Sequence, residues 1–230
     1  MTSRKLVIAI DGPAASGKST TARLVAARLG YLHVDTGAMY RAFALKVLRR
    51  KIAVDDRQGI ETLISGTHIA LGLQGDALRV FLDGEDVSDA IRSPAISRAV
   101  SPVSGHPGVR RAMVREQRVL GVQGGIVMDG RDIGTVVYPD ADLKFFMVAS
   151  LEARARRRQE ELTGTGTAIP LDAVVQDIQE RDARDAGRAE SPLRRADDAI
   201  NIDTSAMTIE QQVEMVLQAV SRKLQERRMR

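Results

Sequence analysis

The sequence predicts an α/β fold in which a central five-stranded parallel sheet is flanked by helices. Two observations carry this prediction: short apolar runs recur along the chain, and helical periodicity fills the intervals between them. At 230 residues and 43% hydrophobic, the chain also has the size of one such domain with an insertion. The apolar runs are residues 7–11, 32–35, 126–129, 143–148 and 200–203.

The first apolar run leads directly into the stretch GPAASGKS, residues 12–19. This stretch matches the phosphate-binding P-loop pattern G-x-x-x-x-G-K-[ST], between a buried strand and a helix as the motif requires. The glycines allow successive backbone N–H groups to point at phosphate oxygens. Lys18 is expected to reach the β- and γ-phosphates, and the Ser19 hydroxyl to ligate Mg²⁺. The motif predicts a nucleoside triphosphate site within a three-layer P-loop fold.

Helical periodicity is clearest directly after this motif and at the end of the chain. Gly30 is expected to end the first of these helices as a C-cap. Thr208 and Gln211 fit a capping box that opens the last one. The apolar faces consist of Ala22, Val25, Ala26 and Leu29 in the first helix and Ile209, Val213, Val216, Leu217 and Val220 in the last.

Between the second and third runs, the α/β alternation is interrupted. Alternating apolar and polar residues in 67–73 and 78–82 flank Gln74-Gly75-Asp76 and predict a β-hairpin. A turn at Asp83-Gly84 then leads to a third short strand, so we predict a small antiparallel sheet. Insertions of this kind commonly cover a second substrate. The predicted division is a core of residues 1–62 and 100–230 and an insert of residues 63–99.

Two arginine-bearing helical patterns flank the stretch Thr163-Gly164-Thr165-Gly166-Thr167. The first pattern spans 151–162, and the second begins near Leu171. Two helices joined by a glycine-rich tip are typical of a closing lid, which we place at about residues 154–170. A solvated basic helix face would explain any one of the arginines equally well. These arginines are Arg154, Arg156, Arg157 and Arg158.

Composition excludes several kinds of site. The chain has no cysteine, which excludes disulfides and thiolate metal sites and fits a reducing cytoplasm. Its three histidines have no zinc-ligand spacing and are expected to be surface or packing residues. We find no signal peptide or membrane-spanning stretch. The net charge of +4 suits phosphorylated small molecules better than nucleic acid, because only 3% of residues are aromatic. We expect a cytoplasmic monomer with no nucleic-acid or membrane partner.

Four of the apolar runs end in aspartate: Asp11, Asp35, Asp129 and Asp203. Because ligands of parallel α/β sheets bind outside the carboxyl ends of the strands, we expect these carboxylates to border one crevice. They would then form a rim that binds metal and substrate. A helix N-cap or a turn would explain any single one of them. Asp129 is the member to which we give a ligand-binding role individually.

Asp129 opens the cluster DGRDIGT, residues 129–135, and further arginines follow in the chain. Phosphoryl transfer demands charge neutralisation and alignment more than covalent help, and bidentate guanidinium groups suit that task. An alcohol acceptor would profit from a general base. A phosphate acceptor is already anionic, so it needs no base, and the many arginines favour it.

At these motifs the sequence resembles the bacterial type of cytidylate kinase, within the nucleoside monophosphate kinases. The resemblance spans nearly the whole chain. It implies ATP-dependent transfer of the γ-phosphate to CMP or dCMP, with Mg²⁺, which gives CDP or dCDP and ADP. The matching segments are IDGPAASGKST (10–20), DTGAMYR (35–41), LDGEDVSDAIR (82–92), DGRDIGTVVYPDADLK (129–144), RARRR (154–158) and ERDARDAGRAESPL (180–193).

The resemblance also implies roles for individual residues. The catalytic set would be Lys18, Arg131, Asp132 and Arg157. The ATP-binding set would be Gly12, Pro13, Ala14, Ala15, Ser16, Gly17, Lys18, Ser19, Thr20, Arg154, Arg157 and Arg158. Around the cytosine would lie Thr36, Arg110, Asp132 and Arg188; at the acceptor phosphate Arg41 and Arg131; at the sugar Ser101, Arg181 and Asp185. Ser19 and Asp129 would bind Mg²⁺, partly through water. Asp132 would accept from the exocyclic amine, a group that uracil lacks.

Two alternatives keep the triphosphate site but change what it serves. A kinase of a small alcohol, of the shikimate type, is disfavoured by the antiparallel insert and the arginine–aspartate series. A nucleotide-dependent switch or nucleic-acid-binding module is disfavoured because a guanine-reading N-K-x-D element is missing from the sequence. The relative preference for CMP, dCMP and UMP is not predicted.

Overall fold

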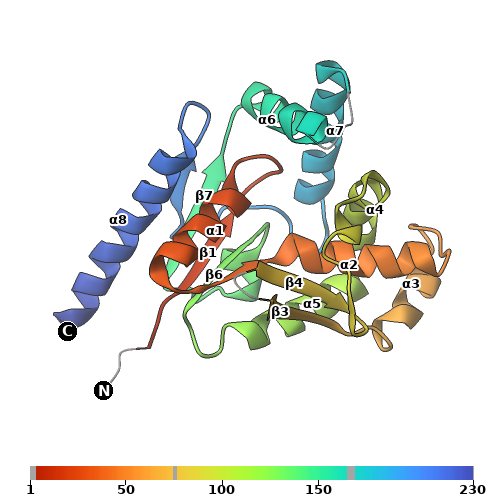
Figure 1. Cartoon of the computed structure of the whole chain (residues 1–230), viewed down its shortest axis with the longest axis horizontal. Coiled ribbons are helices and arrows are strands. Elements are labelled where there is room, and N and C mark those ends of the chain that lie inside the picture. The colour runs from red at the N-terminus through yellow and green to blue at the C-terminus, as the bar shows by residue number, and fades with distance from the viewer. Residues whose placement is uncertain (1–3, 75–76, 165–168, 230) are drawn as a thin grey trace. The chain divides into compact units, whose positions relative to one another are not determined.

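The computed structural model describes residues 4–74, 77–164 and 169–229. The chain divides into two compact units, which are described separately below. The first consists of Met1–Val34 with Gly121–Arg230, and the second of Asp35–Leu120. The predicted insert, residues 63–99, lies inside the second unit. Figure 1 labels many of the helices and strands of the two units.

The first unit is organised around a five-stranded sheet with the order β2-β6-β1-β7-β8. Strand β1 pairs in parallel with both β6 and β7, and β7 pairs in parallel with β8. All five residues of β1 are buried, as expected for the central strand of a parallel sheet. The predicted five-stranded parallel sheet is therefore confirmed. Its strands are β1 (Val7–Asp11), β2 (Leu32–Asp35), β6 (Ile126–Gly130), β7 (Leu143–Val148) and β8 (Ile200–Asp203).

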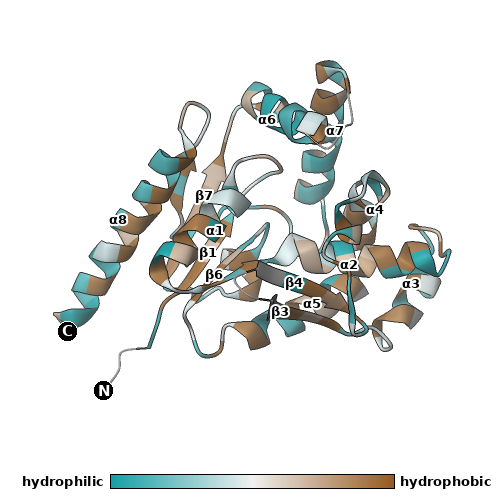
Figure 2. Cartoon of the chain, in the orientation of Figure 1, coloured by the Kyte–Doolittle hydropathy of each residue, from teal (hydrophilic) through white to brown (hydrophobic). Residues whose placement is uncertain are grey.

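Helices α1 (Lys18–Leu29) and α8 (Ile209–Arg228) pack on this sheet and on each other. Their buried faces include Val25 and Val213, which share a hydrophobic cluster with Phe145 of β7. The predicted C-cap is confirmed, since Gly30 has a φ of 62°. The capping box is also present, with Thr208 and Gln211 bonded reciprocally. Both hydrophobic and hydrophilic residues line α8 (Figure 2), consistent with a helix that buries one face.

The remaining helices of the first unit lie after β6 and β7. A π-helical turn, η2 (Ile133–Val137), follows the DGRD segment. Helices α6 (Leu151–Gly164) and α7 (Leu171–Ala186) pack together through a small cluster that includes Ala155, Val174 and Ile178. The two helices predicted for the lid are thus present. Residues 165–167 of the predicted glycine-rich tip lie outside the described residues.

The second unit contains the small antiparallel sheet, with the order β3-β4-β5. It packs with the surrounding helices around a core that includes Phe43 and Ile60. The predicted antiparallel sheet is confirmed, although Gly75 and Asp76 of its first turn lie outside the described residues. The strands are β3 (Ile69–Gln74), β4 (Ala77–Leu82) and β5 (Glu85–Asp86). The helices are α2 (Thr36–Arg49), α3 (Arg57–Ile64), η1 (Ala90–Arg92), α4 (Pro94–Ser104) and α5 (Pro107–Leu120).

Across residues 4–74, 77–164 and 169–229, every helix is too short or too polar to cross a membrane.

Candidate active site

The loop between β1 and α1 has the backbone geometry of a phosphate-binding nest. Gly12, Ala15 and Gly17 have φ values of 152°, 58° and 90°, so residues in the left-handed region recur along the loop. A Cβ at Gly12 would lie 2.1 Å from the carbonyl oxygen of Met147, and one at Gly17 would lie 2.7 Å from Gln212 Oε1. Glycine is therefore required at both positions. A backbone of this kind turns successive N–H groups toward one centre, where an anion binds.

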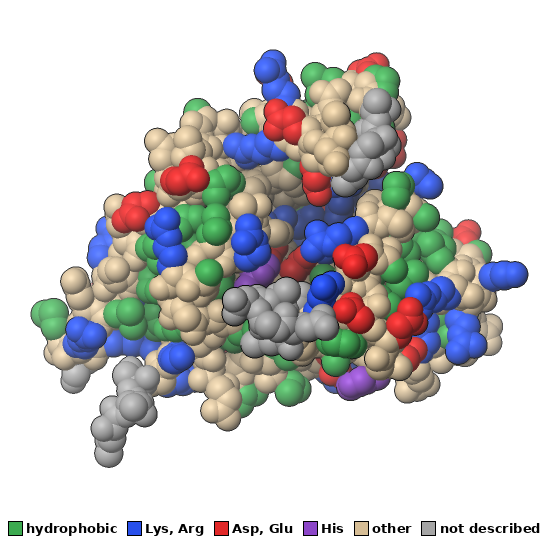
Figure 3. All heavy atoms as spheres, viewed as in Figure 1, with side chains coloured by type: hydrophobic (Ala, Val, Ile, Leu, Met, Phe, Trp, Pro, Cys, Tyr) green, Lys and Arg blue, Asp and Glu red, His purple; other side chains and the backbone are tan. Residues whose placement is uncertain are grey.

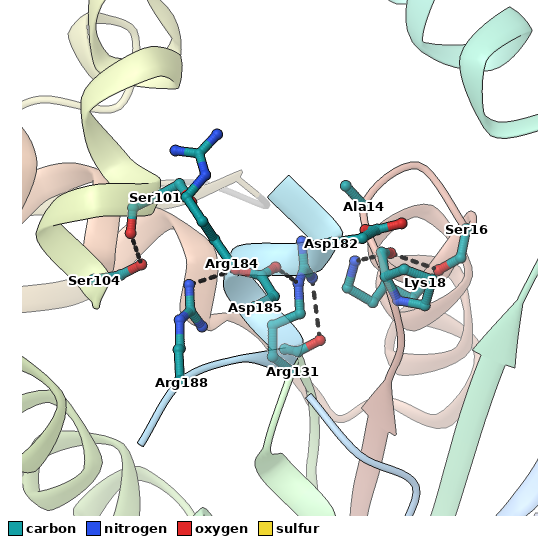
Figure 4. A network of polar contacts seen from close by, with 12 residues as sticks. Ala14, Ser16, Lys18, Ser101, Ser104, Arg131, Asp182, Arg184, Asp185 and Arg188 are labelled. Atoms are coloured by element: carbon teal, nitrogen blue, oxygen red, sulfur yellow. Dashed lines mark hydrogen bonds and ion pairs between the residues drawn. The ribbon is translucent and has the colours of Figure 1, made fainter. Parts of the chain in front are cut away.

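Lys18, the first residue of α1, lies folded over this loop. Its Nζ donates to the carbonyl oxygen of Pro13 at 3.1 Å, and the Ser16 hydroxyl donates to the same oxygen at 3.1 Å (Figure 4). Only 6% of Lys18 is exposed. The ammonium group is thus held close to the nest, where phosphate oxygens would take over its hydrogen bonds.

Ser19 and Asp129, the two residues expected to bind Mg²⁺, are hydrogen-bonded to each other beyond the carboxyl ends of β1 and β6. The Ser19 hydroxyl donates to Asp129 Oδ2 at 2.5 Å, and His33 Nε2 lies 2.8 Å from Asp129 Oδ1. Asp129 is 1% exposed. A hydroxyl and a carboxylate are the hard oxygen ligands that Mg²⁺ prefers, with phosphate oxygens and water completing its shell. The donor set fits Mg²⁺. Among the described residues no cluster of three or more His, Cys, Asp or Glu side chains could hold a metal by itself.

The other three strand-terminal aspartates bond to nearby backbone instead of forming a shared metal rim. Asp11 accepts from Ile133 N and Gly134 N, at the start of η2. Asp35 caps α2 by accepting from Ala38 N at 3.0 Å. Asp203 accepts from Ser205 N at 2.9 Å, within a turn. The interpretation of the four carboxylates as one rim is corrected accordingly, because backbone N–H groups at strand ends compete for the same oxygens.

A buried carboxylate orients two of the predicted substrate-binding arginines in the first unit. Asp185 of α7 accepts from Arg131 Nε at 2.8 Å and from Arg188 Nη2 at 2.5 Å, so both its oxygens are engaged (Figure 4). Burial alone would raise the pKa of Asp185, but Arg131, Arg188 and Arg181 outweigh it and hold that pKa below its usual 3.8. Asp185 is therefore a fixed anion between cations.

The three arginines of α6 that were expected to bind ATP have different surroundings. Arg154 is 8% exposed and donates to Asp182 Oδ2 at 2.6 Å and to the P-loop carbonyl of Ala14 at 3.4 Å. Arg157 donates to the hydroxyl and the carbonyl oxygen of Thr204. Arg158 forms an exposed pair with Glu161, one turn along its own helix. Two of the three are therefore anchored beside the P-loop region, and the third pairs within its own helix.

Four predicted substrate-binding residues belong to the second unit. Arg110 is 2% exposed, and its guanidinium lies 5.2 Å from the centroid of the Tyr40 ring. Ser101 is also buried, and its hydroxyl has no hydrogen-bond partner among the described residues. Thr36 begins α2 and is 3% exposed, and Arg41 pairs with Asp35 at 2.7 Å. The structure thus brings Arg131, Asp185 and Arg188 together within the first unit and carries these four on the second.

The family of the chain follows from comparison with known proteins. A family model described as cytidylate kinase matches residues 8–222. This chain belongs to the cytidylate kinase family. The cytidylate kinase of Pelotomaculum thermopropionicum is 52% identical over 215 residues, which cover 93% of this chain and 95% of that protein. The cytidylate kinase of Caldanaerobacter subterraneus is 52% identical over 213 residues, covering 93% of each.

Among solved structures, an uncharacterized protein from Eubacterium ventriosum ATCC 27560 superposes with a TM-score of 0.51. The match covers 94% of this chain and 98% of that protein at 11% identity, so the likeness is one of fold alone. The sequence resemblance to the cytidylate kinase family, drawn from six segments, is confirmed by these comparisons.

Three residues of this cytidylate kinase family member make contacts that were not predicted from the sequence. His33 was expected to be a surface or packing residue, yet it contacts Asp129. Thr204 is fully buried and joins Arg157 to the P-loop, because its hydroxyl donates to the carbonyl oxygen of Ser16 at 2.9 Å. Asp11 was expected only as one member of the strand-end rim, and its bonds to Ile133 N and Gly134 N were not predicted. Their position in the sequence could have identified His33 and Thr204 as site residues, because both lie at or beside the carboxyl ends of strands.

Proposed function

We propose that this member of the cytidylate kinase family transfers the γ-phosphate of ATP to CMP or dCMP, forming CDP or dCDP and ADP. The observation that carries the proposal is the Arg131–Asp185–Arg188 cluster in the same unit as a complete P-loop. Two polyanions repel each other, and fixed guanidinium groups neutralise that repulsion without a general base. The catalytic requirement is alignment, which buried and paired arginines provide.

On the donor side, the P-loop N–H groups and Lys18 hold the β- and γ-phosphates. Ser19 and Asp129 would hold Mg²⁺, Asp129 partly through water, and the metal would supply further neutralisation of the developing charge. His33 orients Asp129 from the side opposite Ser19. Arg154 and Arg157 of α6 are assigned to cover the transferring group and exclude water, and their contacts with Ala14 and Thr204 support this assignment.

On the acceptor side, Arg131 and Arg41 are assigned to the monophosphate. Asp132, 3% exposed, accepts from the exocyclic amine of cytosine, with Thr36, Arg110 and Arg188 around the base. Ser101, Arg181 and Asp185 are assigned to the sugar. The buried Ser101 hydroxyl supports that assignment, because buried hydroxyl groups that lack a protein partner commonly bond a ligand or water.

A substrate panel tests this function. ADP formation is measured with purified protein, MgATP and each common nucleoside monophosphate, and with shikimate as an alcohol acceptor. CMP and dCMP are expected to be the preferred acceptors, and phosphorylation of the alcohol alone would overturn the proposal.

Lys18→Ala is expected to lower kcat by about 10²- to 10³-fold, because one electrostatic clamp on the transferred group is lost. Turnover like that of the wild type in this variant would remove Lys18 from the mechanism.

We also propose that the protein works as a cytoplasmic monomer, without a nucleic-acid or membrane partner. Basic and acidic side chains lie among one another on the face displayed in Figure 3, which supports small anionic ligands over a long nucleic-acid track. A light-scattering measurement of mass tests the monomer, and a salt titration of nucleic-acid affinity tests the partner.

A further inference from the structure

The carboxylate of Asp11 joins two loops that are distant in sequence. Asp11 is the last residue of β1 and is followed by Gly12, the first residue of the P-loop. Its Oδ1 accepts from Ile133 N at 2.8 Å, and its Oδ2 accepts from Gly134 N at 2.7 Å. Both donors directly follow Asp132, which is assigned to the cytosine. The carboxylate thus clamps the backbone next to the base-reading residue.

Asp11 is costly to bury, which argues that both of its oxygens are needed. It is only 4% exposed, and burial raises its pKa to about 7 although the N–H groups of Gly134 and Ile133 act in the opposite direction. An amide or hydroxyl side chain at this strand end would avoid that cost. Neither can accept from two neighbouring N–H groups through two equivalent oxygens in the same way.

The segment that Asp11 holds has an unusual backbone. Ile133–Val137 forms a π-helical turn, in which Asp132 O accepts from Val136 N at 2.8 Å and Val137 N at 3.2 Å. Turns of this kind are rare and frequently occur at functional sites. The first N–H groups of such a turn have no acceptor within it, so the Asp11 carboxylate supplies one. The position of Asp132 therefore depends on a contact from the end of β1.

We propose that Asp11 is a positioning residue for acceptor recognition. It fixes Asp132 relative to the P-loop, so that a cytosine bound to Asp132 presents its phosphate to the donor nucleotide. Asp11 itself contacts neither nucleotide and acts through the backbone of Ile133 and Gly134. This inference rests on the proposed function, and in particular on the assignment of Asp132 to cytosine. The inference goes beyond that function because it makes the choice of base depend on Asp11, a residue of the strand that precedes the P-loop.

The variant Asp11→Asn tests the inference with little change in shape. The asparagine has one acceptor oxygen, and its NH₂ group would face the second backbone N–H. A misplacement of about 1 Å at a reacting group costs on the order of 10²-fold. We therefore expect kcat/KM for CMP to fall by about 10- to 100-fold, with the KM for ATP within about twofold. The ratio of kcat/KM for CMP to that for UMP is expected to shrink, because Asp132 is displaced from the amine.

Asp142 offers a matched control at the opposite end of the same strand. Its Oδ2 accepts from Val7 N at 2.7 Å, and its other oxygen pairs with Arg227. Asp142→Asn is expected to lower the Tm while leaving the CMP-to-UMP ratio unchanged. If Asp11→Asn lowered CMP and UMP use equally, or matched Asp142→Asn in every parameter, Asp11 would be structural only.

A second variant, Gly134→Ala, keeps the Asp11 carboxylate and adds a methyl group beside it. A Cβ at Gly134 would lie 3.1 Å from Lys144 Cδ and 3.4 Å from Asp11 Oδ2. Gly134→Ala is therefore expected to fold and to reduce the CMP-to-UMP ratio by about two- to fivefold, a smaller displacement of the same loop. An unchanged ratio in Gly134→Ala would overturn the inference if Asp11→Asn failed to fold. If the wild type did not phosphorylate CMP, the proposed function itself would be wrong. If the wild type phosphorylated CMP and both variants kept its CMP-to-UMP ratio, only the role of Asp11 would be rejected.

Discussion

Replacement of Asp185 by Asn tests the electrostatic logic of the site most directly. Asp185 is 2% exposed and accepts from Arg131 and Arg188, so the substitution leaves two guanidinium groups facing a neutral amide. Removing one partner of a buried ion pair costs about 3–5 kcal/mol. The amide oxygen still accepts from one arginine, so we expect a loss of about 3 kcal/mol in the free energy of unfolding. In a chain of this size that loss lowers the Tm by about 6–12 °C.

The same substitution releases Arg131 from its fixed direction. A lost transition-state donor costs about 10²- to 10³-fold in kcat. Because Arg131 is still present in Asp185→Asn, we expect a smaller decrease, about 10- to 100-fold. Asp177→Asn is the matched control, since Asp177 is exposed on the same helix and the change in charge is the same. Thermal melts and coupled ADP assays of both variants measure the difference.

The effect of Asp185 also has a pH signature. Its pKa is lower in the folded protein than in the unfolded chain, so its stabilisation is complete above the unfolded pKa near 4. That stabilisation is lost as the pH falls through the lower pKa of the folded state. The difference in unfolding free energy between wild type and Asp185→Asn should therefore be constant from pH 5 to 7 and narrow below about pH 4. A variant as stable and as active as Asp177→Asn would refute the reasoning.

Three further predictions concern the donor side and β1. Ser19→Ala is expected to raise the Mg²⁺ concentration for half-maximal activity several-fold, and an unchanged Mg²⁺ titration would remove Ser19 as a ligand. Arg157→Lys should lower kcat by about tenfold or more, whereas Arg158→Lys should change it less than twofold because its Glu161 pair is exposed; equal losses would contradict this. Burial raises the pKa of Asp11 to about 7, and the charge of Asp132 adds to this increase while that of Lys18 opposes it. The folded protein therefore holds this proton up to a higher pH than the unfolded chain does. As the pH rises from 4 to 7, the unfolding free energy should fall by up to about 4 kcal/mol. Unfolding free energies from urea titrations should depend less on pH in Asp11→Asn than in the wild type. The same pH dependence in both proteins would show that Asp11 does not ionise in this range.

The elements of the fold were predictable because their signals are local. A strand buried on both faces, such as β1, is visible as a continuous apolar run, and β6 follows the same rule. The caps at Gly30 and Thr208 depend on residues within one helical turn. Turn and periodicity signals likewise placed β3 and β4. Each of these features is determined by neighbours a few residues apart.

The contacts that complete the candidate site were not predictable in this way. Asp11 bonds to Gly134, 123 residues away, and His33 to Asp129, 96 residues away. Thr204 reaches Ser16 across 188 residues. The sequence identifies such residues as polar and near strand ends, but their partners depend on strand order, and β6 and β7 lie on either side of β1. The contact between Asp11 and Gly134 could therefore be found only in the folded sheet.

The strand order also brings the P-loop and the DGRD segment together in the first unit. Strands β1 and β6 are adjacent and in parallel register, with Ile10 beside Asp129 and Asp11 beside Gly130. The P-loop and the DGRD segment therefore leave the sheet at the same level. Two ties then connect them, Ser19 with Asp129 and Asp11 with the backbone after Asp132. Because two contacts connect the P-loop with the DGRD segment, we expect a substitution in either loop to affect the position of the other.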